Sequence, residues 1–174
     1  MFIDLNEILT EAGREKSFNV KLDSEVLDYH YQNLDVIESD TTLAFTNEGN
    51  KNLSLKADIY AKLNIPCDRC IEPTEVCLKF SVNKDLDMKK TSKEREEELD
   101  ECIFLQNMNF DTEVFLKNEI LVNLPMKVLC SEDCKGICNK CGTNLNNGSC
   151  DCDTTELDPR MSKILDVFNQ FKEV

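Results

Sequence analysis

The sequence has no tryptophan, a single histidine (His30), and only 5 glycines among its 174 residues. It also lacks long apolar runs: none approaches the roughly 18 to 20 residues needed to cross a bilayer. Its first residues, Met1 to Glu7, show neither the basic nor the apolar region of a secretory signal. These absences predict a cytoplasmic protein that does not associate with a membrane.

Catalytic motifs are equally scarce. The chain contains no Gly-rich phosphate loop and no H-E-x-x-H zinc motif. A nucleophilic cysteine needs a base, and the only imidazole, His30, stands among polar neighbours and is typical of a surface histidine. The sequence therefore predicts that the protein is not an enzyme, with no catalytic residue and no small-molecule substrate.

Positive charge is also in short supply. Lys and Arg number 20 against 34 Asp and Glu, which gives a formal net charge of -14. Such a surface repels phosphate backbones and lacks the electrostatic attraction behind non-specific nucleic-acid binding. A basic protein is the kind of partner that this charge favours, and ribosomal proteins are a large cytoplasmic group of that kind.

Cysteine, by contrast, is abundant. Ten cysteines in a chain without a secretory signal favour metal binding over disulfides, because most of them stand in closely spaced pairs. Four thiolates in a tetrahedron are the preferred ligands of structural zinc. Eight cysteines form such pairs: Cys67 and Cys70, Cys130 and Cys134, Cys138 and Cys141, and Cys150 and Cys152.

The simplest partition of these pairs is local and predicts two zinc sites. One site takes Cys138, Cys141, Cys150 and Cys152; the other takes Cys67, Cys70, Cys130 and Cys134. Cys77 and Cys102 remain as free thiols. A single zinc ion, with the other cysteines free, is the alternative. Because all-cysteine sites are closed to substrate, we expect a structural role for the metal.

Hydrophobic periodicity predicts an α+β fold. Apolar residues alternate with polar ones over residues 18–22, 53–65 and 76–82, and residues 36–45 read as a further strand, with a turn at 47–50. Cys67 and Cys70 then lie at a hairpin tip. A short helical turn is expected near residues 5–9, and a helix capped by Asp111 ends before Pro125. We expect a curved, barrel-like antiparallel sheet with packed helices and a small C-terminal zinc module.

These elements predict two domains. Residues 1–125 form the β domain, with the CxxC hairpin tip, a charged and acidic loop at 83–101, and the helix from Asp111. The loop is expected to be solvated; a docking segment that orders on binding is the alternative. Residues 126–174 form the Cys-rich module and a last helix that starts at Asp158 and Pro159.

Several of these motifs together resemble the YceD proteins, also called large ribosomal RNA subunit accumulation proteins. The resemblance runs over most of the chain and is most specific in its C-terminal part. The matching segments are Ile3–Leu5, Cys67–Cys70 with Glu72 and Pro73, Glu119–Pro125, Cys134–Cys138, Cys141–Asn146, Cys150–Cys152 and Asp158–Arg160. The resemblance implies a cytoplasmic bacterial protein needed for normal accumulation of large-subunit (23S) ribosomal RNA.

Taken together, the sequence favours a non-catalytic ribosome-biogenesis factor that acts as a zinc-stabilised adaptor. Its expected partner is a ribosomal protein, an rRNA-processing factor or an rRNA precursor, with Arg69 and Arg160 as candidate contacts to RNA or to a partner. For Arg160 a capped helix start at Asp158 is the simpler explanation. Two alternatives stay open: a redox-responsive zinc-thiolate chaperone, and a zinc module that binds RNA directly.

Overall fold

The computed structural model describes residues 1–22, 26–29, 32–97 and 102–152, and the chain divides into two compact units. The first unit comprises Met1–Pro66 and Pro73–Val128, and the second comprises Cys67–Glu72 and Leu129–Val174. The hairpin tip with Cys67 and Cys70 therefore groups with the Cys-rich segment, although it connects two strands of the first unit. His30, Arg160 and the helix expected from Asp158 lie outside the described residues.

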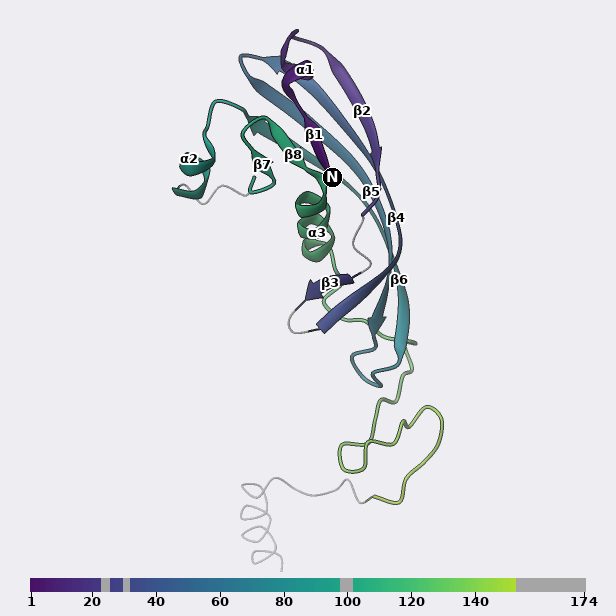
Figure 1. The fold of residues 1–174 in the computed structure, drawn as a ribbon. Helices are drawn as coiled ribbons and strands as arrows, with labels where there is room; N and C mark the ends of the chain where they lie inside the picture. Colours follow the sequence, from purple (N-terminus) through teal and green to yellow (C-terminus); the bar gives the residue numbers. More distant parts are fainter. Residues whose placement is uncertain (23–25, 30–31, 98–101, 153–174) are drawn as a thin grey trace, which may run out of the picture. The chain divides into compact units, whose positions relative to one another are not determined.

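A five-stranded antiparallel sheet dominates the first unit (Figure 1). Its strands are β2 (Glu15–Val20), β3 (Val26–Tyr29), β4 (Gln32–Gly49), β5 (Asn52–Pro66) and β6 (Pro73–Asp87). Their order is β2-β4-β5-β6, and β3 pairs with β4. Alternate residues of β5 from Leu53 to Ile65 are buried, which confirms the strand predicted from the period-two pattern.

The hairpin between β4 and β5 turns later than the sequence predicts. Asn50 and Lys51 both take positive φ (51° and 61°) between the paired residues Gly49 and Asn52. Two central residues in this conformation make the turn type that matches the natural twist of a β-hairpin. Asn47, expected in the turn, is instead a buried β4 residue whose side-chain amide donates to the carbonyl oxygens of Ile8 and Glu11 at 3.0 and 2.8 Å.

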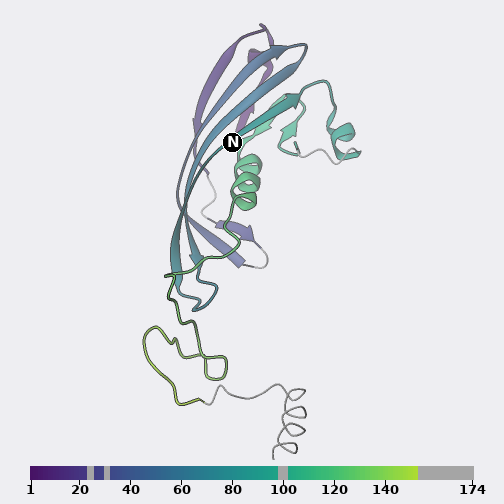
Figure 2. The ribbon, with the colours of Figure 1, turned by 180° about the vertical axis from the view of Figure 1, so that it is seen from behind.

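The expected barrel-like closure is wrong, because the sheet is open. β2 and β6 lie at its two edges, and no pairing joins them among the described strands. The long strands do bend, as Figures 1 and 2 show, and helix α3 (Thr112–Val122) lies on the concave side of the bend. Curvature without pairing of the two edges leaves the sheet open, which local periodicity cannot reveal.

A second, three-stranded sheet and three helices complete the first unit. The sheet has the order β1-β8-β7, and the helix α3 begins after the capping residue Asp111, whose carboxylate accepts from the N–H groups of Glu113 and Val114 at 3.1 and 3.3 Å. This confirms the predicted cap. The elements are β1 (Phe2–Asp4), α1 (Asn6–Leu9), α2 (Ser92–Glu97), β7 (Leu105–Gln106), β8 (Asn109–Asp111) and α3 (Thr112–Val122).

Phenylalanines connect these smaller elements to the long sheet. Phe110 of β8 contacts Phe45 of β4 and Phe115 of α3, with ring centroids 5.1 and 5.2 Å apart, and Phe104 packs against the same group. All four rings are fully buried. Edge-on and tilted aromatic pairs at these distances are favourable beyond the area they bury. They hold α3 and the small sheet on the concave face.

The expected solvated loop at 83–101 is wrong for most of its length. Strand β6 continues to Asp87, α2 covers 92–97, and Leu86 and Met88 are buried in the core. Residues 98–101 lie outside the described part. Of the basic side chains in this stretch, Lys84 pairs with Glu119 of α3, and Arg95 donates to the carbonyl of Asp87. Lys84 and Arg95 therefore brace the unit, and the stretch is a strand end and a helix instead of a solvated loop.

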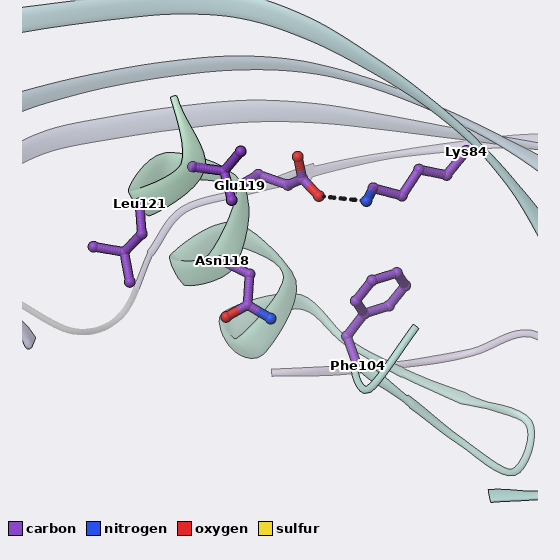
Figure 3. A pocket seen from close by; sticks show the side chains of 6 residues that line it. Lys84, Phe104, Asn118, Glu119 and Leu121 are labelled. Atoms are coloured by element: carbon purple, nitrogen blue, oxygen red, sulfur yellow. Dashed lines mark ion pairs between the residues drawn. The ribbon is translucent and has the colours of Figure 1, made fainter. Parts of the chain in front are cut away.

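The Lys84–Glu119 pair borders a hollow of about 430 Å³ beside α3, which Figure 3 shows from close by. Phe104, Asn118, Leu121 and Val122 form the rest of its lining. Among the described residues, no helix has both the length and the apolar character required to span a membrane.

Candidate metal centres

The eight paired cysteines come together in two groups of four, both in the second unit. Within each group all the sulfur atoms lie within 4.8 Å of one another. We name them cluster A, made of Cys67, Cys70, Cys130 and Cys134, and cluster B, made of Cys138, Cys141, Cys150 and Cys152. These are the two groups that sequence spacing favours. The two cysteines left over, Cys77 on β6 and Cys102 in the core of the first unit, belong to neither.

The spacing within cluster A fits a four-coordinate metal. Four sulfurs bound to one zinc ion at about 2.3 Å in a tetrahedron lie about 3.8 Å apart. The Cys67 and Cys134 sulfurs are 3.8 Å apart, and those of Cys70 and Cys130 are 3.5 Å apart. A disulfide would need about 2.05 Å. The sulfurs therefore stand at the spacing of metal ligands.

Each cluster begins with the same backbone turn. In cluster A the Cys67 N–H donates to the carbonyl oxygen of Glu72 at 2.8 Å, and the Ile71 N–H donates to that of Cys67 at 2.9 Å. In cluster B the Cys138 N–H donates to the carbonyl of Thr143, and the Gly142 N–H to that of Cys138, at the same two distances. The turn, which we call the knuckle, aims backbone amides at the first cysteine of each C-x2-C pair, as a zinc knuckle requires.

These amides favour thiolates over thiols. Burial raises the pKa of Cys67, but the N–H groups of Arg69, Cys70 and Cys130 outweigh it and hold that pKa at about 6. In cluster B the hydroxyl and then the backbone N–H of Thr143 are the main groups that lower the pKa of Cys141 to about 6. A low thiol pKa favours metal binding at neutral pH because the ligand is the thiolate.

In each cluster another cysteine has a raised pKa instead of a lowered one. The N–H of Glu72 favours the Cys70 thiolate, but burial and the three other cluster A thiols outweigh it and raise the pKa of Cys70 to about 12. In cluster B the thiol of Cys141, followed by burial, raises the pKa of Cys152 to about 12. Four thiolates so close together repel one another unless a cation lies between them. The donor set is therefore complete only when a metal supplies that charge.

Asparagines that follow Cys141 brace cluster A and its hairpin tip, and sequence reasoning missed them. The side chain of Asn146 donates to the sulfur of Cys134 at 3.3 Å and accepts from the N–H of Lys135 at 2.7 Å. Asn144 and Asn147 both donate to the carboxylate of Glu72, at 2.7 and 3.1 Å. The sequence does contain a sign of them, a dense run of Asn after Cys141, which is typical of turns held by side-chain hydrogen bonds to the backbone. Second-sphere bonds of this kind orient metal ligands.

Arg69, a predicted contact to RNA or a partner, has an internal role in the structure. Its guanidinium donates to the carbonyl oxygen of Cys134 at 2.7 Å, and its own carbonyl accepts from the N–H of Ile137 at 3.0 Å. Gly136 packs so closely that an added Cβ would lie 3.0 Å from the Arg69 carbonyl oxygen. Arg69 thus joins the hairpin tip to the segment that follows Cys134. Its contact with a partner stays a prediction.

Comparison with known proteins agrees with these features. The profile described as "Large ribosomal RNA subunit accumulation protein YceD" matches residues 55–168, more than half of the chain. One similar protein is the "Large ribosomal RNA subunit accumulation protein YCED homolog 1, chloroplastic" of Arabidopsis thaliana. It is 35% identical over 48 residues, which are 28% of this chain and 15% of the relative.

The chain thus aligns with a small part of that relative's length. No solved structure matches the chain. The matched range 55–168 includes both C-x2-C knuckles and all eight clustered cysteines. On this match, which covers most of β5, all of β6, α3 and the Cys-rich segment, the chain belongs to the YceD family.

Proposed function

We propose that this protein supports the accumulation of large-subunit ribosomal RNA as a non-catalytic, zinc-stabilised adaptor. The family description supplies the process. The observation that carries the adaptor role is the pair of closed four-sulfur clusters, since neither leaves a coordination position for substrate or water. In this proposal each cluster holds one zinc ion, and the metal stabilises the surface that a partner recognises.

The metals would compensate for the small hydrophobic core among the described residues of the second unit. Among its described residues, the buried apolar group consists of Cys67, Cys70 and Cys134 with Leu129 packed against them. So little apolar burial is far below what a small domain needs to fold alone. Structural zinc supplies that stability in many small modules. Loss of the metal should therefore unfold this unit.

The partner we propose is a basic ribosomal or processing protein in the cytoplasm. The net charge of -14 favours a cationic surface. The described part of the second unit also carries more acidic than basic side chains, and four thiolates with one Zn²⁺ add further negative charge in each cluster. Direct binding of this unit to an RNA backbone is therefore the weaker alternative.

Depletion of the protein in cells tests the proposed function. We expect the ratio of large- to small-subunit ribosomal RNA to fall, and the wild-type chain to restore it. Cys138→Ser should fail to restore the ratio, and Cys77→Ser, which removes a thiol outside both clusters, should restore it fully. An unchanged ratio on depletion would overturn the role in rRNA accumulation.

Peroxide treatment of the purified protein, together with the depletion result, distinguishes the adaptor from the redox-responsive chaperone. If oxidation expels zinc and activates a chaperone, the purified protein should suppress aggregation of a denatured client only after peroxide treatment. Zinc retained under peroxide, together with a fallen rRNA ratio on depletion, would exclude that alternative and support the adaptor.

A further inference from the structure

Within the described part of the chain, the outer edge of β6 is a long sheet edge with no strand partner. β6 has 15 residues, whereas β2 at the opposite edge has 6. No strand of the described residues pairs with the far side of β6 (Figures 1 and 2). Its register with β5 runs without a bulge from Pro73 to Asp87, whereas the β4–β5 register shifts twice. Soluble proteins usually shorten, bulge or cover such edges, because a regular edge accepts another strand.

The inward face of β6 is only partly covered. Leu86 is fully buried at one end of this face, but the four apolar residues from Val76 to Val82 are half-buried, while their partners one strand further in, on β5, are fully buried. A strand added beside β6 would cover these half-buried side chains, as β6 already covers the apolar side chains of β5. The paired residues are Val76 with Leu63, Leu78 with Ala61, Phe80 with Ile59, and Val82 with Ala57.

The outward face of β6 is acidic. It presents Glu75, Asp85 and Asp87, with Lys79 as its basic residue. Glu75 is paired with Lys62 of β5 at 2.8 Å, so Asp85 and Asp87 are the acids left for an added strand. Lys84, the other lysine of β6, faces inward and pairs with Glu119 at 2.8 Å. A hollow of about 460 Å³ on the sheet, which Lys79 also lines, contains two further carboxylates, Asp40 and Asp58. A strand that presents cations on this face and apolar side chains on the other would complement β6 on both faces.

We infer that the free edge of β6 binds an extended segment of a basic protein, which joins the sheet as a strand with alternating apolar and Lys or Arg residues. Backbone hydrogen bonds along the edge supply affinity, and the two faces supply selectivity. The inference rests on the proposed function, because it identifies the chemistry of the basic partner that the adaptor would hold.

A designed peptide tests this edge directly. The probe is a nine-residue peptide that alternates Val with Lys or Arg, compared with a scrambled peptide of the same composition. We expect at least tenfold tighter binding of the alternating peptide, and slower hydrogen exchange of β6 amides when it is bound. Equal affinity for both peptides, or binding without protection of β6, would overturn the inference. Protection that rises with protein concentration without peptide would assign the edge to a second copy of this chain and overturn it as well.

A pair of charge-reversal variants locates the site. Asp85→Lys reverses an exposed side chain of β6 and should weaken peptide binding at least fivefold. Glu15→Lys is the matched control, because it reverses an exposed acid on the opposite edge strand, and it should bind like the wild type. Weakening by both variants to the same extent would show a general charge effect and contradict a site at β6.

The rRNA ratio separates this inference from the proposed function. An unchanged ratio on depletion overturns the proposed function, while peptide protection of β6 would still stand. If depletion lowers the ratio and the β6 variant restores it despite losing the peptide, the adaptor role survives and the edge is not its docking site. Failure of the β6 variant to restore the ratio, with Glu15→Lys active, supports both.

Discussion

Ile71 and Gly142 occupy the same position in two equivalent turns. Each follows the second cysteine of a C-x2-C pair, donates its N–H at 2.9 Å to the carbonyl of the first cysteine, and takes a positive φ, 64° for Ile71 and 74° for Gly142. Glycine adopts this conformation without strain, whereas a β-branched residue does not. Cluster A is therefore built on a strained knuckle and cluster B on a relaxed one.

Ile71→Gly should stabilise the metal-loaded protein. Relief of the left-handed strain is worth about 1–2 kcal/mol, against an entropic cost of about 0.5–1 kcal/mol for an added glycine. Little burial is lost, because Ile71 is 66% exposed. We expect a net gain of about 0.5–1 kcal/mol in urea unfolding of the zinc-loaded chain. Gly142→Ala is the converse test and should lose about 1 kcal/mol, since its added Cβ meets nothing within 4 Å and only the backbone is strained. A loss from Ile71→Gly would contradict the strain.

Gly136→Ala should cost more than Gly142→Ala. Both glycines have positive φ, but the Cβ added at Gly136 lies 3.0 Å from the carbonyl oxygen of Arg69. We expect a loss of about 2–3 kcal/mol, because backbone strain and crowding against a fixed carbonyl add together. In Gly136→Ala the added Cβ displaces Arg69, which contacts Cys134 of cluster A. A chelator should therefore remove zinc from cluster A of this variant before it removes zinc from cluster B. Equal losses of stability from the two variants would mean that the backbone at Gly136 and Arg69 shifts to accept the added Cβ and that the contact adds no cost.

Zinc content should fall one ion at a time. Native mass spectrometry of the wild type should show two ions per chain, and Cys67→Ser or Cys138→Ser should show one, because the clusters share no ligand. Cys77→Ser should keep both, since Cys77 lies outside the clusters. No bound metal in a wild-type chain purified without chelator would overturn the zinc proposal.

Acidification should release the metal. In cluster A the pKa values of Cys67 and Cys134 are lowered and those of Cys70 and Cys130 are raised; cluster B divides in the same way. Near neutral pH the two cysteines with raised pKa values in each cluster are protonated, so each cluster releases at least two protons when it binds zinc, and its affinity falls at least about a hundredfold per pH unit as pH decreases. Below about pH 6, Cys67 and Cys141 take up protons as well, so the fall steepens. Calorimetry in buffers of different ionisation enthalpy measures the proton count, and a count near zero would contradict the division.

The Lys84–Glu119 pair should couple α3 to β6. The two side chains are 20% and 10% exposed and their charged atoms are 2.8 Å apart. Lys84→Met or Glu119→Gln alone should cost about 2 kcal/mol, because each leaves the other partner poorly solvated. The double variant should cost less than the sum of the two. A double-mutant cycle in urea measures this coupling, and strict additivity would show that the pair contributes nothing.

Sequence reasoning succeeded where the signal is local. The alternation from Leu53 to Ile65 and the cap at Asp111 are both present in the structure, and cysteine spacing favoured the same two groups of four. These features depend on residues that are close in sequence or on a strong ligand preference.

Other features depend on distant partners. Strand β1 exists because Phe2 to Asp4 pair with Asp111 to Asn109, and three residues carry no period of their own. The end of β6 was missed because Lys84 and Asp85 mask the buried Leu86. The edges of the sheet stay apart for geometric reasons that an alternating pattern does not encode.

The two clusters draw their cysteines from very different lengths of chain, and this sets how long the first cysteine pair of each cluster waits for the second pair during synthesis. Cluster B takes all its ligands from residues 138–152, whereas Cys70 and Cys130 of cluster A are 60 residues apart. Closing the longer loop costs about 2 kcal/mol more in chain entropy. A growing chain therefore carries the Cys67–Cys70 tip as a bare thiol pair through the synthesis of β6 and α3 until Cys130 and Cys134 follow, and it is exposed to oxidation and to the wrong metals throughout that interval.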